Sequence, residues 1–187
     1  MALVVAIGEV MVELSLGAER AASLGFAGDT FNTAVYLSRL GCETSYATVL
    51  GQDDPFTIAI LALMRDEGLD TSLVAKAQAR LPGLYAIERD ARGERRFFYW
   101  RGEAPIREFV ALVDLDALAA RAAAADLVFL SAITLAVVGD AGRAALAGLL
   151  PAGRVGLDLN YRARLWANPT AARAAIEAVA PLCRIIS

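Results

Sequence analysis

The stretch GFAGDTFNTAVYLSRLG, residues 25–41, decides the fold, because it marks a helix with a defined beginning and end. Its apolar side chains recur at helical spacing and predict an amphipathic helix over 30–40. Asp29 is the expected N-cap, since a short carboxylate accepts hydrogen bonds from the free N–H groups of a first turn. Gly41 suits the C′ position, where a left-handed backbone favours glycine.

Apolar runs on both sides of this helix predict a sheet. ALVVAIG, residues 2–8, and SYATVLG, residues 45–51, are typical of buried strands. A second helix begins at Pro55, because proline suits the first helical position. Strands that alternate with helices in this way predict an α/β fold with a parallel sheet. The alternation continues with strands expected at 126–133, from 154 onward and at 183–187.

The bulk composition excludes several classes of function. The 187 residues suffice for one main domain, and no apolar run is long enough for a transmembrane helix. A net charge of −3 provides no basic surface for nucleic acid. Histidine is absent, which removes Ser-His-Asp and Cys-His nucleophiles and histidine zinc sites. We therefore expect neither a nucleic-acid partner nor a membrane partner.

The N-terminus and the cysteines indicate a cytoplasmic protein. No basic region precedes the N-terminal apolar run, and Glu9 and Glu13 interrupt it, so a buried strand fits better than a secretory leader. Cys42 and Cys183 lie far apart in the sequence and fit a reducing compartment as small hydrophobic residues.

The run RLPGLYAIERDARGERRFFYWRG, residues 80–102, breaks the alternation and predicts a β-hairpin. If 91–93 form a three-residue loop with Gly93 in the left-handed conformation, the pairing register follows by counting. One face then carries two phenols and a guanidinium, which suit a carboxylate; aromatic packing alone is the alternative. The pairs expected on this face are Gly83 with Arg101, Tyr85 with Tyr99 and Ile87 with Phe97.

Two polar clusters occur where an α/β fold binds ligands. Gly28, Asp29 and Asn32 stand at a helix N-terminus, which favours anions or hydroxyl oxygens. Asp158 and Asn160 follow a predicted strand, at the sheet edge where open α/β folds bind ligands. A simple helix cap and a solvated turn are the alternatives. The G-x-G-x-x-G and Walker motifs of nucleotide sites are absent.

Together, four segments resemble the PfkB/ribokinase-like carbohydrate kinases, and most closely their 2-keto-3-deoxygluconate kinase branch. The segments are GEVMVEL, GDTFNTAVYLSRLG, RLPGLYAIERDARGERRFFYWR and DLNYRARLW, so the resemblance covers essentially the whole chain. It implies a three-layer α/β/α sandwich with a mainly parallel sheet and a small β-hairpin lid at about 80–104. Residues 1–187 would be the N-terminal part of this kinase domain, with the C-terminal part of the fold missing.

The resemblance also implies an activity and a set of site residues. Relatives use ATP and Mg²⁺ to phosphorylate 2-dehydro-3-deoxy-D-gluconate to its 6-phosphate. The implied partners are a small sugar acid and, because relatives often dimerise through the lid, a second copy of the chain. The implied substrate-binding residues are Gly28, Asp29, Thr30, Phe31, Asn32, Tyr85, Tyr99, Trp100, Arg101 and Arg162, with Arg101 on the substrate carboxylate. The residues implied at the boundary with the nucleotide phosphates are Asn160, Tyr161 and Arg162.

The sequence departs from the family in lacking its catalytic half. The G-A-G-D motif whose Asp is the family's catalytic base is absent, as are the Asn/Glu motif near magnesium and the nucleotide pocket. In the family these lie beyond the position of Ser187, so we expect no catalytic or metal-binding residue here. Phosphoryl transfer depends on positioning and charge neutralisation, so these residues alone are expected to be inactive. The alternatives are a non-catalytic sugar-acid-binding or dimerisation module and a PfkB kinase for a neutral sugar such as fructose.

Overall fold

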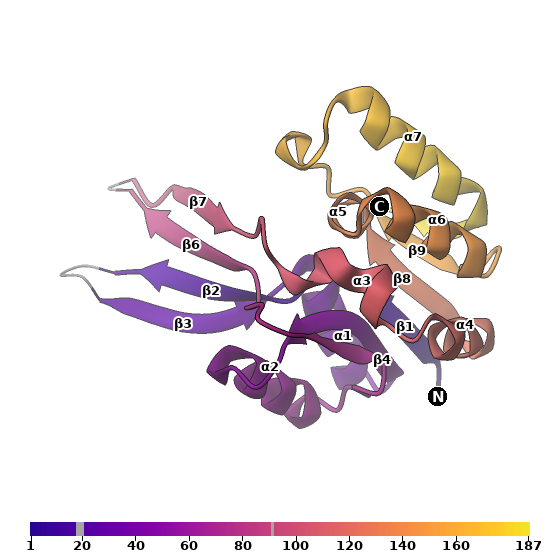
Figure 1. Cartoon of the computed structure of the whole chain (residues 1–187), viewed down its shortest axis with the longest axis horizontal. Coiled ribbons are helices and arrows are strands. Elements are labelled where there is room, and N and C mark those ends of the chain that lie inside the picture. Colours follow the sequence, from indigo (N-terminus) through magenta and orange to yellow (C-terminus); the bar gives the residue numbers. More distant parts are fainter. Residues whose placement is uncertain (18–20, 91) are drawn as a thin grey trace.

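A six-stranded parallel sheet forms the centre of the molecule (Figure 1). The computed structural model describes residues 1–17, 21–90 and 92–187. The strand order is β10-β9-β8-β1-β4-β5, and every neighbouring pair is parallel, which confirms the predicted sheet. The strands are β1 (Leu3–Ile7), β4 (Glu43–Gly51), β5 (Val74–Ala77), β8 (Leu127–Ser131), β9 (Val155–Asp158) and β10 (Cys183–Ile186).

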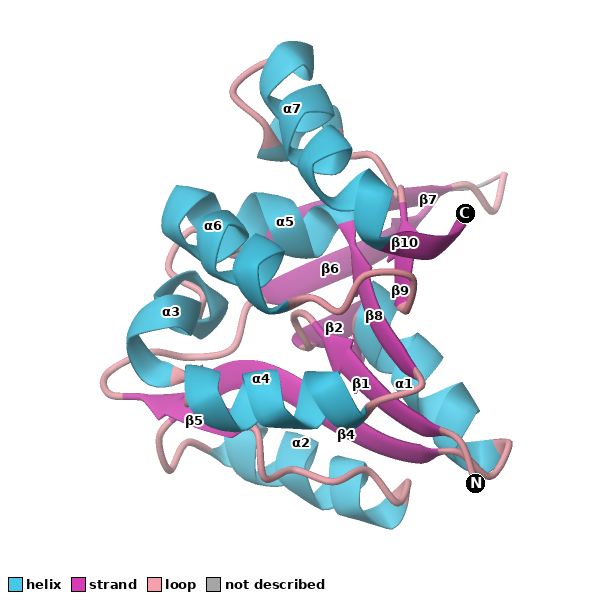
Figure 2. Cartoon of the chain, turned by 90° about the vertical axis from the view of Figure 1, so that its right-hand side faces the viewer, coloured by secondary structure: helices cyan, strands magenta, loops and turns pink. Residues whose placement is uncertain are grey.

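Helices cover both faces of this sheet and complete the expected three-layer α/β/α sandwich (Figure 2). One face carries α1 (Asp29–Arg39) and α2 (Pro55–Asp66). The helices of the other face are α3 (Phe109–Leu112), α4 (Leu115–Ala124), α5 (Ala132–Val137), α6 (Gly139–Leu149) and α7 (Pro169–Val179). Short 3-10 turns are η2 (Pro105–Glu108), η3 (Ala163–Leu165) and η4 (Ala180–Leu182).

Alternation along the strands divides the core in two. Successive side chains of a strand point to opposite faces of the sheet. Val5 and Ile7 pack in the cluster that includes side chains from α3 to α6, whereas Ala6 packs with α1 and α2. In β4, Ala47 and Tyr46 separate in the same way. Burial of both clusters is what holds the helices on the sheet.

Helix α1 begins one residue earlier than expected, and Asp29 is not its N-cap. The N-cap is Gly28, which has an extended backbone and no capping side chain. Asp29 occupies the first helical position, where its carboxylate accepts a hydrogen bond from the Thr30 backbone N–H at 2.8 Å. A Cβ at Gly28 would lie 2.2 Å from the Glu9 carbonyl oxygen, so the close approach requires glycine. Gly41 follows the helix with a φ of +88°, as expected.

The hairpin belongs to a four-stranded sheet, which is larger than the small β-hairpin lid expected at about 80–104 (Figure 1). The order is β3-β2-β6-β7, in which β2 and β6 are parallel and the outer pairs are antiparallel. The sequence predicts a buried strand for the N-terminal run, but it predicts neither β3 nor the pairing of β2 with the hairpin. We call this the lid sheet; its strands are β2 (Met11–Leu16), β3 (Ala22–Ala27), β6 (Leu84–Arg89) and β7 (Arg95–Trp100).

The predicted hairpin register is confirmed. Tyr85 pairs with Tyr99, and Ile87 pairs with Phe97. The expected pairing of Gly83 with Arg101 falls one step beyond the ladder, which ends at Leu84 and Trp100. The two segments are still close there, because a Cβ at Gly83 would lie 3.3 Å from the Cβ of Arg101.

The hairpin turn follows the expected chemistry. The Asp90 backbone N–H donates to the Glu94 carbonyl at 3.0 Å, and Gly93 has a φ of +83°. Ala91, the first residue of the expected loop, lies outside the described residues.

Helix α5 is a further difference from the sequence prediction. The strand expected over 126–133 ends at Ser131, whose hydroxyl accepts a hydrogen bond from the Thr134 backbone N–H at 3.2 Å and caps α5.

Within the described ranges, no helix combines the length and the apolar character needed to cross a membrane.

Ser187 lies just after β10, because the strand expected over 183–187 ends at Ile186. Its backbone still bonds to the neighbouring segment of the sheet. The Ser187 N–H donates to the Leu157 carbonyl at 3.0 Å, and the Ser187 carbonyl accepts from the Leu159 N–H at 2.8 Å. Ser187 thus continues the pairing of β10 with β9 and is not among the residues that line the pocket described below.

Candidate functional site

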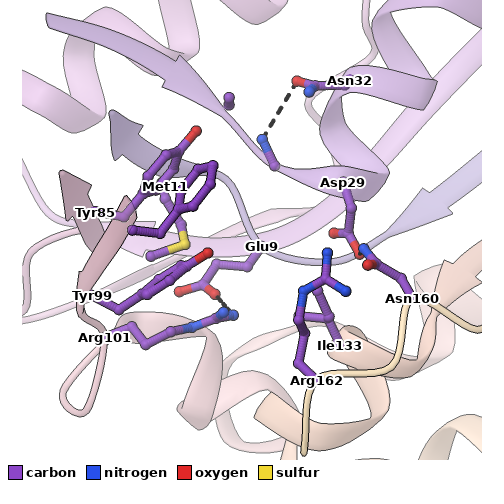
Figure 3. A pocket seen from close by; sticks show the side chains of 13 residues that line it. Glu9, Met11, Asp29, Asn32, Tyr85, Tyr99, Arg101, Ile133, Asn160 and Arg162 are labelled. Atoms are coloured by element: carbon purple, nitrogen blue, oxygen red, sulfur yellow. Dashed lines mark hydrogen bonds and ion pairs between the residues drawn. The ribbon is translucent and has the colours of Figure 1, made fainter. Parts of the chain in front are cut away.

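A pocket lies between the inner face of the lid sheet and the carboxyl ends of β1 and β9 (Figure 3). The inner face is the one that carries Tyr85 and Tyr99. Glu9 follows β1, Asn160 follows β9, and Asp29 opens α1. Because open α/β sheets bind ligands at this edge, the topology puts the pocket where a ligand is expected.

Eight of the residues singled out from the sequence line this pocket. They come from three separate parts of the chain, and Figure 3 shows the side chains of seven of them, all but Gly28, around a common space. They are Gly28, Asp29, Asn32, Tyr85, Tyr99, Arg101, Asn160 and Arg162. The lining residues that the sequence reading did not assign to a site are Glu9, Met11, Ala27, Phe97 and Ile133.

Thr30 and Phe31 are buried in the core beside the pocket. The hydroxyls of Thr30 and Tyr46 lie 2.9 Å apart, and the rings of Phe31 and Tyr46 pack edge to face with centroids 5.6 Å apart. Burial raises the pKa of the Tyr46 phenol well above its usual value, so the phenol stays protonated. The side chains of Thr30 and Phe31 therefore hold α1 on β4 and do not line the pocket.

Trp100 lies on the opposite face of the lid sheet and does not line the pocket, which corrects the expectation that it faces the ligand. It pairs with Leu84 and lines a separate hollow, and its side chain is 62% exposed. The alternation of a strand requires this, since neighbouring residues point to opposite faces. Tyr161 also lies outside the pocket lining.

The floor of the pocket joins α1 to the segment after β9. The Asn160 amide donates to the Asp29 carboxylate at 3.1 Å. Asn32 accepts a hydrogen bond from the Gly28 backbone N–H through its side-chain oxygen at 3.4 Å (Figure 3). This contact leaves the Asn32 NH₂ group pointing elsewhere, so Asn32 is able to donate to a ligand.

A buried ion pair between Glu9 and Arg101 is the feature of the site that the sequence reading missed. The Arg101 guanidinium donates to the Glu9 carboxylate, and the two side chains are only 11% and 5% exposed, with Arg101 the more exposed. Burial raises the pKa of Glu9, and the neighbouring Arg101 opposes this effect. A Cβ at Gly83 would lie 2.7 Å from the second Glu9 oxygen, so Gly83 makes room for the pair. Arg101 is therefore charge-compensated within the protein.

Tyr85 directs its only hydroxyl proton to a second carboxylate, that of Glu13. Partial burial and this hydrogen bond raise the pKa of the Tyr85 phenol. The ring stacks on Tyr99 at a centroid distance of 5.7 Å, and Phe97 extends the stack. With its proton committed to Glu13, the Tyr85 oxygen is left as an acceptor toward the pocket, suited to a ligand hydroxyl.

Arg162 brings an uncompensated positive charge to the pocket. Its guanidinium donates to the Tyr161 carbonyl at 3.2 Å, and it forms no ion pair with any residue that the structure describes. Arg162, rather than Arg101, is thus the lining residue best placed to attract an anion.

Across residues 1–17, 21–90 and 92–187, no group of three or more His, Cys, Asp and Glu side chains could hold a metal ion.

The fold is similar to that of carbohydrate kinases whose crystal structures are known. A PfkB family carbohydrate kinase from Listeria grayi superposes with a TM-score of 0.82 at 24% identity, covering 96% of this chain and 58% of that one. A 2-dehydro-3-deoxygluconokinase from Thermotoga maritima superposes with a TM-score of 0.74 at 25% identity, covering 89% of this chain and 53% of that one. The architecture is therefore that of the ribokinase-like carbohydrate kinases.

Sequence comparison gives the family. Residues 1–187 match the pfkB family of carbohydrate kinases, and the chain belongs to this family of transferases. It is 42% identical over 180 residues to a 2-dehydro-3-deoxygluconokinase of Dickeya dadantii (strain 3937), covering 90% of this chain and 57% of the relative. It is 41% identical over 173 residues to the enzyme of the same name from Escherichia coli (strain K12), covering 87% of this chain and 55% of the relative. The chain thus spans somewhat more than half the length of these relatives.

Proposed function

We propose that this chain forms the acceptor-binding part of a 2-dehydro-3-deoxygluconokinase, which phosphorylates 2-dehydro-3-deoxy-D-gluconate to its 6-phosphate with ATP. Relatives at 41–42% identity carry this name. The observation that carries the proposal is the Arg162 guanidinium, which lines the pocket without a carboxylate partner in the described part of the chain. A cation beside amide and phenol groups suits a sugar that bears a carboxylate.

The remaining lining residues fit the hydroxyl groups of such a ligand. Tyr85 is oriented as an acceptor by Glu13, and the Asn32 amide has hydrogen atoms to donate. Gly28 makes room for the Glu9 backbone beside the pocket, since a Cβ there would lie 2.2 Å from the Glu9 carbonyl oxygen. Arg101, already paired with Glu9, serves as a hydrogen-bond donor of fixed orientation rather than as the main charge.

ATP and Mg²⁺ enter the proposal through the family. A bound nucleotide supplies the phosphoryl group that is transferred. Of the residues expected at its border, Asn160 and Arg162 line the pocket and offer an amide and a free cation, which fit one edge of a phosphate. These two residues alone do not make a complete polyphosphate site, because they offer one guanidinium and one amide that already donates to Asp29.

Binding of the acid tests the proposal directly. We expect calorimetry to detect 2-dehydro-3-deoxy-D-gluconate on the 187-residue chain and to detect fructose only weakly. Arg162→Met should weaken binding of the acid by about 1.5–3 kcal/mol, the range for a charged hydrogen bond. Arg173→Met is the matched control, since Arg173 lies on α7 in an exposed ion pair with Glu177.

Equal affinity for the acid and fructose would favour the alternative of a kinase for a neutral sugar. An Arg162→Met variant that binds the acid as well as the wild type would contradict the proposed charge recognition. For catalysis, we expect the chain to form no ADP from ATP in the presence of the sugar acid, because it lacks the G-A-G-D base. Turnover by the purified chain would show that another group acts as the base.

We also propose that two copies associate through the outer face of the lid sheet. That face exposes Leu24, Phe98 and Trp100, whose exposed fractions are 53%, 40% and 62%. Phe98 and Trp100 are two residues apart on the same face of β7, and exposed apolar patches are typical of interaction surfaces. Analytical ultracentrifugation should find a dimer that Trp100→Ser weakens. A wild-type chain that is monomeric at high micromolar concentration would contradict the proposal.

A cytoplasmic location is part of the same proposal. Both cysteines, Cys42 and Cys183, are free thiols, which suits a reducing compartment.

A further inference from the structure

Arg164 connects the main domain to the lid sheet through an aromatic ring. It belongs to the turn η3, which follows the pocket residue Arg162, and its guanidinium carbon lies 4.3 Å from the centre of the Tyr99 ring. A guanidinium over the face of a tyrosine is attracted by the negative charge of the ring face. Arginine is well suited to this contact, because its planar head stacks on aromatic rings.

Tyr99 belongs to a stack of three aromatic rings that lines the pocket. Its ring stacks on Tyr85 and on Phe97, with centroids 5.7 and 6.3 Å away. These three rings belong to two neighbouring strands of the lid sheet, β6 and β7. A contact that restrains the Tyr99 ring therefore also restrains the two rings that stack on it.

The turn that carries Arg164 is itself tied to the helical layer at its other end. The Arg143 guanidinium of α6 lies 5.5 Å from the centre of the Trp166 ring. Arg143 also donates to the Leu135 carbonyl of α5 at 2.9 Å. The segment after β9 is thus held by one arginine–aromatic contact to the core and by another to the lid sheet.

We infer that the Arg164–Tyr99 contact is a latch that holds the lid sheet over the pocket, and that Arg164 is a positioning residue. A side compartment of the pocket is lined by Tyr99, Arg101, Ile133, Arg162, Arg164 and Leu165, so four of its six residues are shared with the main pocket. Separation of Arg164 from Tyr99 would open the pocket through this compartment. The latch does not require a ligand, because the contact is made by the protein alone.

Hydrogen exchange of the free protein tests the latch. Arg164→Met keeps the length of the side chain and removes its charge, so we expect peptides that cover 95–104 and 159–166 to exchange about two- to fivefold faster. Arg164→Lys should restore part of the protection, because an ammonium group also binds the ring face. Arg173→Met, on the exposed surface of α7, should leave both peptides unchanged.

Two results would overturn the inference. One is an Arg164→Met variant in which both peptides are as protected as in the wild type. The other is an Arg164→Lys variant that exchanges as fast as Arg164→Met, because the positive charge over the ring would then be irrelevant.

Nuclear magnetic resonance gives a second readout: the Arg164 side-chain protons should be shifted upfield by the Tyr99 ring, and Tyr99→Leu should abolish the shift. An unshifted signal in the wild type would contradict the contact in solution.

The consequence for a ligand rests on the proposed function and is measured separately. If the pocket binds the sugar acid, Arg164→Met should release it about two- to fivefold faster in stopped-flow fluorescence, whereas Arg173→Met should not. The two failures are distinguishable. A chain that shows the exchange effect without binding the acid refutes the proposed function and leaves the latch in place. A chain that binds the acid without the exchange effect refutes the latch alone.

Discussion

The Asn160 amide donates a hydrogen bond to the Asp29 carboxylate at 3.1 Å, although 131 positions separate the two residues in the sequence. This contact joins the first turn of α1 to the segment that follows β9, and both residues line the pocket. The floor of the site thus depends on an amide that faces a carboxylate.

Replacement of this amide by a second carboxylate should destabilise the protein in a pH-dependent manner. Asn160→Asp places two like charges at hydrogen-bond distance and should cost about 1–2 kcal/mol at pH 7. The repulsion raises the pKa of the introduced carboxyl, so the loss should shrink as the pH falls toward 4 and the group is protonated. Thermal melts at pH 4 and pH 7 measure both effects.

Asn168→Asp is the matched control for this substitution. Asn168 caps α7 by accepting a hydrogen bond from the Ala171 backbone N–H at 2.9 Å, and aspartate caps a helix as well as asparagine does. A loss of stability in Asn160→Asp no larger than that in the control would contradict the Asp29–Asn160 contact.

The buried carboxylate of Glu9 should leave a signature in the pH dependence of stability. Burial raises the pKa of Glu9 in the folded state above its unfolded value of about 4.3. A group of this kind favours folding while it is protonated and loses that contribution as the pH rises. The free energy of unfolding of the wild type should therefore fall relative to that of Glu9→Gln as the pH increases from 4.

Urea unfolding of both proteins at several pH values provides the comparison. The other carboxyl groups are common to both proteins, so the difference isolates Glu9. A wild-type stability that instead rises relative to Glu9→Gln over this range would mean that the attraction of Arg101 outweighs the effect of burial.

Glu13 and Tyr85 should be energetically coupled, since the phenol donates its proton to this carboxylate. In a double-mutant cycle with Glu13→Ala and Tyr85→Phe, we expect a coupling of about 1 kcal/mol, the size of one partly exposed hydrogen bond. Tyr36→Phe serves as the control partner, because Tyr36 is 64% exposed and lies on α1. Additive losses for Glu13 and Tyr85 would show that the phenol is free, and hence able to donate to a ligand.

Gly28 should tolerate no side chain. Its added Cβ would meet the Glu9 carbonyl oxygen at 2.2 Å, a backbone atom that cannot move without shifting the start of the lid sheet. Gly28→Ala should therefore cost about 1–3 kcal/mol in urea unfolding. Gly25→Ala, three residues earlier in β3, has nothing within 4 Å of its added Cβ and should change stability by less than about 0.5 kcal/mol. Similar losses for the two variants would contradict the close contact.

The elements that local periodicity specifies could be predicted from the sequence. The helix after Gly28, the alternation of strands and helices and the pairing of Tyr85 with Tyr99 all depend on residues close in sequence or on a turn that can be counted. The site residues supplied by the family resemblance also fall mostly in one pocket.

What could not be predicted depends on partners far apart in the sequence. Glu9 interrupts an apolar run, and nothing near it indicates that Arg101, 92 positions away, compensates its charge. The strand Met11–Leu16 pairs on one side with β3, which is close in the sequence, but its other neighbour, β6, lies far along the chain, so local sequence does not predict the four-stranded sheet. Trp100 is a different case: the alternation of β7 predicts that it faces away from Tyr99, whereas the family resemblance implies that it faces the ligand.

The parallel pairing of β2 with β6 has a consequence for the order in which the protein forms during translation. Val12 pairs with Leu84, so the β2–β3 hairpin emerges from the ribosome long before its neighbour is synthesised. During that interval the backbone N–H and C=O groups on the edge of β2 that later pairs with β6 have no partner, and such an edge is a template for pairing with other chains. Helix α1 and strand β4 are made in the meantime, and they belong to the main sandwich. The lid sheet is therefore a late-forming unit whose nascent half needs protection from aggregation until β6 arrives.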